Sequence, residues 1–142
     1  MIRYSLNVTE ENNNKQIKTF EDLDVWKACQ KLRKEITELA RKFPKEEQYL
    51  LTDQIIRASR SVTANIAEGY GRFYYQENIQ FCRQARGSLY EILDHLTVAC
   101  DESYITHDSF ETLRNEAVHC IVVLNGYLRY LKSAKDTVES IV

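Results

Sequence analysis

The sequence of 142 residues contains one proline and four glycines, and it has no long uninterrupted apolar run. A membrane-spanning helix needs about 20 predominantly apolar residues, and no segment approaches that length. The N-terminus carries no apolar stretch behind a charged leader, so we expect a cytoplasmic protein without a membrane partner. The scarcity of proline and glycine, with no alternating strand pattern, favours helices over sheets.

The four cysteines are also few and far apart, and they form no Cys-x-x-Cys pair. This spacing disfavours both a zinc site and a disulfide framework. We therefore interpret them as reduced, buried thiols that pack as small apolar side chains. They are Cys29, Cys82, Cys100 and Cys120.

Charge of neither sign predominates, because 19 Lys and Arg stand against 21 Asp and Glu, for a net charge of −2. A strongly basic domain is typical of general nucleic-acid binders. Any nucleic-acid surface on this chain must therefore be local.

What the sequence does contain is a set of apolar residues at three- and four-residue steps, the spacing of one buried helix face. The first stripe must stop before Pro44, and the second ends at Gly69, where we expect a left-handed residue to terminate the helix. Thr106 or Asp108 is a candidate N-cap for the last helix. The four stripes cover Leu23–Phe43, Leu51–Ile66, Asn78–Cys100 and Phe110–Leu131.

Short connections between these segments make consecutive helices antiparallel. The predicted fold is all-α, an up-down-up-down antiparallel four-helix bundle. Residues 1–19 lack helical periodicity and are rich in Asn, so we predict a short, irregular and flexible N-terminal arm before a bundle domain at residues 20–142. This length is enough for one core but not for two.

A single Glu-x-x-His motif, Glu116 with His119, raises the hypothesis of a di-metal site in the bundle core. At 100° per residue, these two side chains lie about 100° and about 160° from the centre of their apolar stripe, whereas core ligands must point inward. The nearest substitute for a second motif, Glu91 with Asp94 and His95, also faces away from its stripe. We expect solvated surface here, and we predict no metal, no cofactor, no catalytic residue and no small-molecule substrate.

Basic residues gather at one end of the predicted bundle. Helix dipoles explain bases near the C-terminus of the fourth helix, but they do not explain Arg83 or Arg86 near the start of the third. We hypothesise a weak, sequence-tolerant polyanion surface here, beside which Tyr74 and Tyr75 stack on unpaired bases. Alternatively, these arginines pair with acids of a neighbouring subunit. The basic residues of this surface are Arg60, Arg72, Arg83, Arg129 and Lys132.

Gly87 suggests a subunit contact. A glycine inside a helix costs about 1 kcal/mol relative to alanine, and Gly87 points roughly 160° away from its apolar stripe. Close approach of another subunit would offset that cost. Asn65 lies about 60° from its stripe centre, so we expect it half-buried and bonded to the backbone of the nearby corner. The candidate interface residues are Ile56, which we expect to face outward, Asn65, Gly69, Gly71 and Gly87. The alternative is a helix cap in a locally packed corner.

Several blocks of the sequence also carry a family resemblance: "FEDLDVWKAC", "FPKEEQYLLTDQIIRASRSVTANIAEGYGR", "FCRQARGSLYEI" and "LNGYLRYLK". They resemble the four-helix-bundle proteins encoded in intervening sequences of bacterial 23S ribosomal RNA genes, over about residues 20–134. The resemblance implies a homo-oligomer, specifically a pentamer. The chain is also similar to the accessory protein of diversity-generating retroelements, a markedly more basic bundle that binds nucleic acid and assists a reverse transcriptase.

Two hypotheses of function follow. The first is a non-enzymatic accessory protein that associates with RNA or DNA. The alternative is a protein-interaction scaffold with no nucleic-acid binding.

Overall fold

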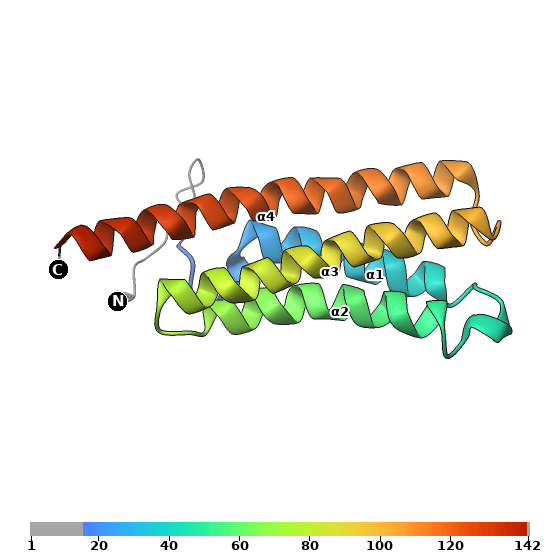
Figure 1. Cartoon of the computed structure of the whole chain (residues 1–142), viewed down its shortest axis with the longest axis horizontal. Helices are drawn as coiled ribbons and strands as arrows, with labels where there is room; N and C mark the ends of the chain where they lie inside the picture. The colour runs from blue at the N-terminus through green and yellow to red at the C-terminus, as the bar shows by residue number, and fades with distance from the viewer. Residues whose placement is uncertain (1–15, 142) are drawn as a thin grey trace.

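The computed structural model describes residues 16–141. Within this range the chain forms four α-helices and two short 3-10 helices, and no β-strand. Figure 1 shows each α-helix running opposite to the one before it, so the predicted all-α, up-down-up-down bundle is confirmed. The elements are η1 (Phe20–Asp22), α1 (Asp24–Ala40), η2 (Lys45–Glu47), α2 (Leu51–Tyr70), α3 (Tyr75–Asp101) and α4 (His107–Ile141).

The four helices form a closed ring. Each packs against its neighbours in sequence, and α1 also packs against α4, whereas among the described residues the diagonal pairs make no such approach. The predicted apolar stripes meet inside this ring, and each helix contributes fully buried side chains. Among the largest are Leu32, Ile36, Ile55, Ile66, Leu89, Ile92, Leu96, Leu124 and Leu131.

The second helix ends differently from the prediction. α2 continues through Gly69 to Tyr70, and Gly71 caps it with φ −74° and ψ −7°. No described glycine has a positive φ, so the left-handed helix end predicted at Gly69 is wrong.

Gly69 is instead a packing residue. It is buried where α2 meets α3, and a Cβ at this position would lie 2.7 Å from Asn78 Oδ1 and 2.9 Å from Phe81 Cβ. Protein interiors are too closely packed to absorb such an overlap without movement. The close crossing of α2 and α3 therefore requires glycine here.

The fourth helix is longer than its apolar stripe. α4 has 35 residues, a length of about 50 Å at 1.5 Å per residue. Its last turns run past the corner between α2 and α3 (Figure 1). At its start, the Ser109 backbone N–H donates to Thr106 Oγ1 at 3.1 Å, so Thr106, one of the two predicted candidates, is the N-cap.

The predicted N-terminal arm lies outside the described residues up to residue 15. Of its remainder, Ile17 is buried. The backbone N–H groups of Lys18 and Thr19 donate to Asp22 Oδ2 at 3.0 and 3.2 Å, which fastens this segment to η1.

None of the helices in residues 16–141 combines the length and the hydrophobicity that crossing a bilayer requires.

Candidate nucleic-acid interface

The predicted basic residues are all exposed, but they do not form one cluster. Arg83 lies on α3, and Arg129 and Lys132 lie on the adjacent α4. Arg60 lies on α2, which does not pack against α4, and Arg72 lies at the corner between α2 and α3. The fold therefore brings together three of the five residues.

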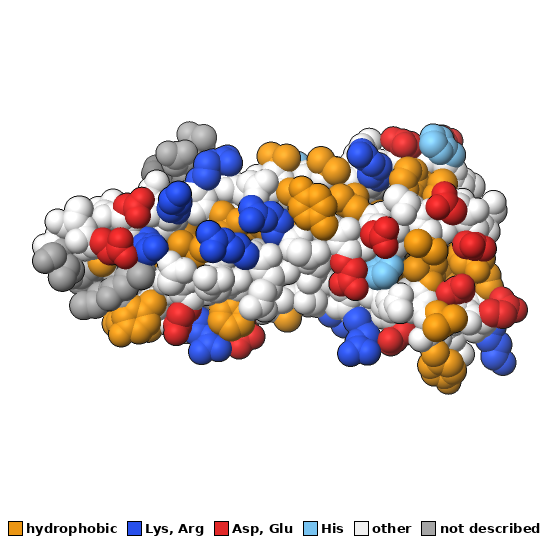
Figure 2. Space-filling model, in the orientation of Figure 1, with side chains coloured by type: hydrophobic (Ala, Val, Ile, Leu, Met, Phe, Trp, Pro, Cys, Tyr) orange, Lys and Arg blue, Asp and Glu red, His pale blue; other side chains and the backbone are white. Residues whose placement is uncertain are grey.

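Figure 2 shows how the charges are distributed on this face. Lys and Arg side chains gather on the part of the face near the C-terminal half of α4, whereas Asp and Glu predominate toward the opposite end of the bundle. The near-neutral sum of charges thus conceals a local separation, as the sequence predicted.

The three grouped cations are uncompensated. Within residues 16–141, no carboxylate forms an ion pair with Arg83, Arg129 or Lys132. Arg72 differs, because its Nη2 donates to Glu68 Oε1 at 3.0 Å and its guanidinium lies 4.9 Å from the Phe81 ring centroid. Unpaired surface cations attract polyanions more strongly than cations already held by a carboxylate.

Arg86 adds a further cation at the seam between α3 and α4. Its Nη1 donates to Asn125 Oδ1 at 2.9 Å, a neutral acceptor that leaves the positive charge in place. The Arg86 side chain is half-buried, so this hydrogen bond holds its charge in place beside the three exposed cations.

The two tyrosines predicted to stack on bases differ in exposure. Tyr75 is only 2% exposed and belongs to the core, so the expectation that it stacks on bases is wrong. Tyr74 is 40% exposed, and its ring packs edge-on against Phe73, with the ring centroids 5.0 Å apart. The corner therefore presents Phe73 and Tyr74 to solvent.

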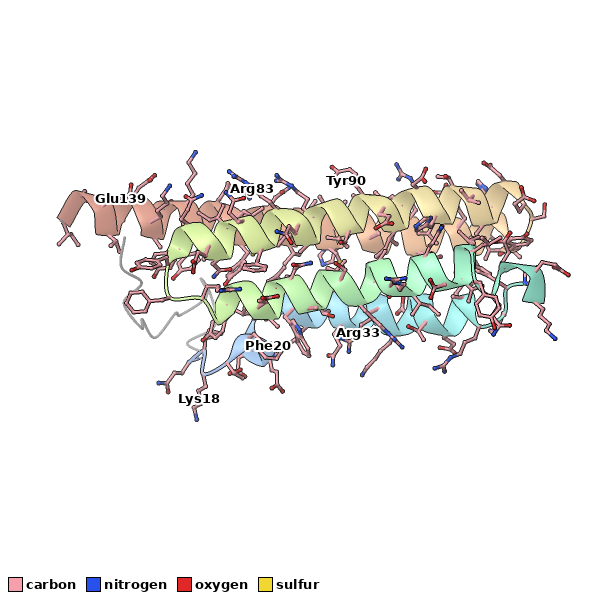
Figure 3. The ribbon with its side chains drawn as sticks, turned by 60° about the horizontal axis from the view of Figure 1, so that its bottom comes forward. Lys18, Phe20, Arg33, Arg83, Tyr90 and Glu139 are labelled. Carbon is pink, nitrogen blue, oxygen red and sulfur yellow. The ribbon has the colours of Figure 1, made fainter. Side chains whose placement is uncertain are left out.

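Sequence reasoning missed two exposed apolar side chains on the basic face. Tyr90 on α3 is 57% exposed, and Val122 on α4 is 59% exposed. Figure 3 shows Arg83 and Tyr90 projecting from the same edge of α3. The signal was present in the sequence, because a spacing of seven residues places both side chains on one helix face.

Three of the predicted interface residues have roles within the chain. Gly69 is closed by α3, as described above. Ile56 is half-buried against the core rather than facing outward. Asn65 is half-buried as predicted, but its Nδ2 donates to the carbonyl and the Oγ of Ser61 at 2.9 and 3.0 Å, not to the corner backbone.

The other two predicted interface residues are exposed. A Cβ on Gly71 would lie 3.5 Å from the nearest atom, the Glu68 carbonyl oxygen, which is an ordinary contact. A Cβ on Gly87 would meet nothing within 4 Å. The subunit contact at Gly87 stays a prediction.

Glu116 is not the solvated residue that we expected. Its side chain is 14% exposed, and Lys31 Nζ lies 3.2 Å from its Oε1 and 3.7 Å from Glu35 Oε1. A hydrogen bond with Glu116, and then burial, raise the pKa of Glu35 to about 7. The two carboxyl groups and one ammonium therefore close the seam between α1 and α4.

The prediction that His95 faces away from the core is also wrong. His95 is 9% exposed, and its Nε2 lies 3.4 Å from Glu91 Oε1, so it faces the core more than its spacing indicated. Residues 16–141 contain no group of three or more His, Cys, Asp or Glu side chains placed to hold a metal ion.

The cysteines form no disulfide, and three of the four are buried. Burial raises the pKa of the Cys82 thiol to about 12, and a hydrogen bond with Cys120 raises the pKa of Cys29. Cys29, Cys82 and Cys120 therefore pack in the core as free cysteines, as the sequence indicated, whereas Cys100 is only half-buried.

A groove of about 370 Å³ lies where α1 ends and α4 begins. Three carboxylates and one lysine line it, so its charge opposes binding of a polyanion. Its lining residues are Glu35, Glu38, Leu39, Lys42, Asp108, Ser109, Thr112 and Leu113.

Comparison with known proteins agrees with this fold. A model of the 23S rRNA-intervening sequence protein family matches residues 21–126. A crystal structure of a protein of unknown function from the S23 ribosomal protein family of Bacteroides thetaiotaomicron is similar with a TM-score of 0.69 and 21% identity, over 74% of this chain and 95% of that chain. At this identity the likeness shows the fold alone. No curated protein matches the chain.

Proposed function

The chain belongs to the family of 23S rRNA-intervening sequence proteins, and from this premise we propose that it is a non-enzymatic accessory protein that binds nucleic-acid backbones through the outer face of α3 and α4. One observation carries the proposal: Arg83, Arg129 and Lys132 are exposed on adjacent helices, with no ion-pair partner in residues 16–141. Such a surface attracts the phosphates of a nucleic-acid backbone. The attraction is electrostatic, so the spacing of the cations does not have to match the spacing of the phosphates closely.

The binding should be weak for one copy and sensitive to salt. For single strands, the logarithm of the association constant falls with a slope of about −0.7 per phosphate contact against the logarithm of the salt concentration. A homo-oligomer would repeat the face, and simultaneous contacts along one strand would then add through effective concentration.

The test is a salt titration with a labelled single-stranded RNA of mixed sequence, followed by fluorescence anisotropy. Arg83→Ala combined with Lys132→Ala should weaken binding and flatten the salt slope. The matched control, Arg57→Ala combined with Arg60→Ala, removes the same charge from α2 and should change binding much less. Wild-type protein that does not bind at low salt, or an equal loss in both double variants, would contradict the proposal.

A second candidate function is a homo-oligomeric scaffold that recognises protein surfaces. Exposed apolar side chains at the two ends of the bundle favour it: Tyr49 and Leu50 before α2 are 83% and 57% exposed, and Phe73 at the opposite corner is 57% exposed. Exposed aromatic groups of this kind are typical of interfaces.

Light scattering tests the scaffold. Tyr49→Ser combined with Leu50→Ser should leave the helical content intact and reduce the particle mass. A wild-type monomer, or an oligomer that this double variant does not change, would argue against these residues as a subunit contact.

A further inference from the structure

Tyr90 projects from the same edge of α3 as Arg83, seven residues further along the helix (Figure 3). Its side chain is 57% exposed, and Val122 of α4 is 59% exposed. Gly87, one helical turn before Tyr90, leaves the adjacent space open, because a Cβ there would meet nothing within 4 Å. These positions form an exposed apolar patch on an otherwise charged face. We call Tyr90, Val122 and the open space over Gly87 the Tyr90 platform.

The charges around the platform are asymmetric. On the side toward the start of α3 lie Arg83, one turn before Gly87, and Arg86, which is held by Asn125 across the seam. On the other side lie two acids of α3, Glu91 and Asp94, of which Glu91 contacts His95. A ligand of the platform should therefore combine an apolar, flat group with a negative charge placed toward Arg83.

Two occupants fit an exposed apolar patch. A second copy whose α3 runs parallel to this one would bring the arginines of both copies together, and like charges across an interface are costly. A second copy whose α3 runs antiparallel would set Arg83 and Arg86 opposite Glu91 and Asp94, and the assembly of the variants tests that occupant. An unpaired nucleobase presents a flat π-face, and its own phosphates supply the negative charge that the arginines lack.

We propose that the Tyr90 platform is a stacking site for an unpaired base of a single-stranded nucleic acid whose phosphates lie toward Arg83. This inference rests on the proposed function and adds a requirement to it. A surface that contacts only phosphates binds single-stranded and double-stranded nucleic acids alike. Stacking on Tyr90, in contrast, requires a base that is not already stacked on its neighbours.

The experiment compares Tyr90→Ala with the wild type on single-stranded RNA and on duplex RNA. Loss of one stacked base should weaken single-strand binding roughly 5- to 150-fold. The salt slope should stay unchanged because no phosphate contact is lost, and duplex binding should stay unchanged because its bases are already stacked.

Three further variants accompany it. Tyr90→Phe keeps the aromatic face and should bind like the wild type. Tyr49→Ala removes another exposed tyrosine, 83% exposed, from the opposite end of the bundle and should have no effect. Gly87→Leu fills the open space of the platform and should therefore weaken single-strand binding. The helical content should not fall, since leucine favours helix more than glycine does.

The outcomes separate the two proposals. If the wild type binds single strands and Tyr90→Ala binds equally well, the stacking site is wrong while the phosphate surface stands. If the wild type binds no nucleic acid at low salt, both are wrong. If Tyr90→Ala and Gly87→Leu both dissociate a wild-type oligomer, a second copy covers the platform and the stacking site is overturned.

Discussion

The inner and outer sides of α3 use glycine in opposite ways. On the inner side, Gly69 of α2 leaves so little room that a Cβ would come within 2.7 Å of Asn78 Oδ1. On the outer side, a Cβ on Gly87 would meet nothing within 4 Å. Both glycines lie inside helices, so helix propensity assigns them the same cost. The difference shows that Gly69 serves the packing of the fold, while the surface beside Gly87 is open.

The largest effect should come from adding a side chain at Gly69, on the inner side. Gly69→Leu forces α2 and α3 apart, because the added atoms would overlap Asn78 and Phe81, and we expect a loss of about 3 kcal/mol or more in the free energy of unfolding. Urea denaturation followed by circular dichroism measures it. Gly87→Leu is the matched control on the outer side and should cost nothing. Equal losses in the two variants would remove the distinction between the sides.

A second variant tests what holds the inner side together. Asn78 is fully buried; its Nδ2 donates to Tyr127 Oη at 3.3 Å, and Cys82 Sγ donates to its Oδ1 at 3.5 Å. Asn78→Ala should lower the free energy of unfolding by about 1 to 2 kcal/mol.

A double-mutant cycle sharpens this result. Asn78 Oδ1 is the atom nearest to a Cβ on Gly69, so Asn78→Ala should partly rescue Gly69→Ala. Strictly additive losses would mean that the two residues do not share the close crossing.

On the outer side, Gly87→Ala should stabilise the protein by up to about 1 kcal/mol, since alanine favours helix and nothing obstructs its methyl group. Thermal unfolding measured at low protein concentration detects the change. A loss of stability that grows with protein concentration would instead reveal a second copy packed against Gly87.

The smallest effect concerns Glu35, which lies with Lys31 and Glu116 at the seam between α1 and α4. The pKa of Glu35 is about 7, above its ordinary value of 4.5. A raised carboxyl pKa means that the folded state holds the proton more tightly, so this stabilisation is complete below about pH 4.5 and is lost as the pH rises through about 7. The Glu35 side chain is 37% exposed, so solvent screening keeps the change small.

Melting temperatures measured across this pH range check the effect. Glu35→Gln keeps the hydrogen-bonding shape without titrating, so it should flatten the decline relative to the wild type. Glu38→Gln, on the exposed surface of the same helix, should not. A wild-type melting temperature that rises through this range would contradict the assignment.

The sequence predicted the bundle because apolar spacing alone determines which face of a helix is buried. The sequence also located the basic residues of α3 and α4. In an up-down bundle the start of the third helix lies beside the C-terminal half of the fourth. The sequence did not predict Tyr75 correctly, since each residue turns the side chain by 100° and the exact helix start decides whether that ring is buried.

Other errors came from contacts between helices. The partner of Glu116 is Lys31 on α1, and the reason for Gly69 is Phe81 and Asn78 on α3. Neither partner follows from the periodicity of a single segment, because periodicity gives a face and not the distance to the helix packed against it. The Tyr90 platform was missed for a different reason. The spacing from Arg83 indicates the face of α3 on which Tyr90 lies, but Val122 lies on α4, and the spacing within one helix does not locate residues of the next.

The closed ring of helices also has a consequence for the order of folding. Contacts between α1 and α2, α2 and α3, and α3 and α4 join neighbours in sequence, whereas the contact between α1 and α4 closes the longest loop in the bundle. Loop-closure entropy makes such a contact slow to form. Residues at that seam, such as Glu35 and Glu116, should therefore have low φ-values, and substitutions there should speed unfolding and leave the folding rate almost unchanged.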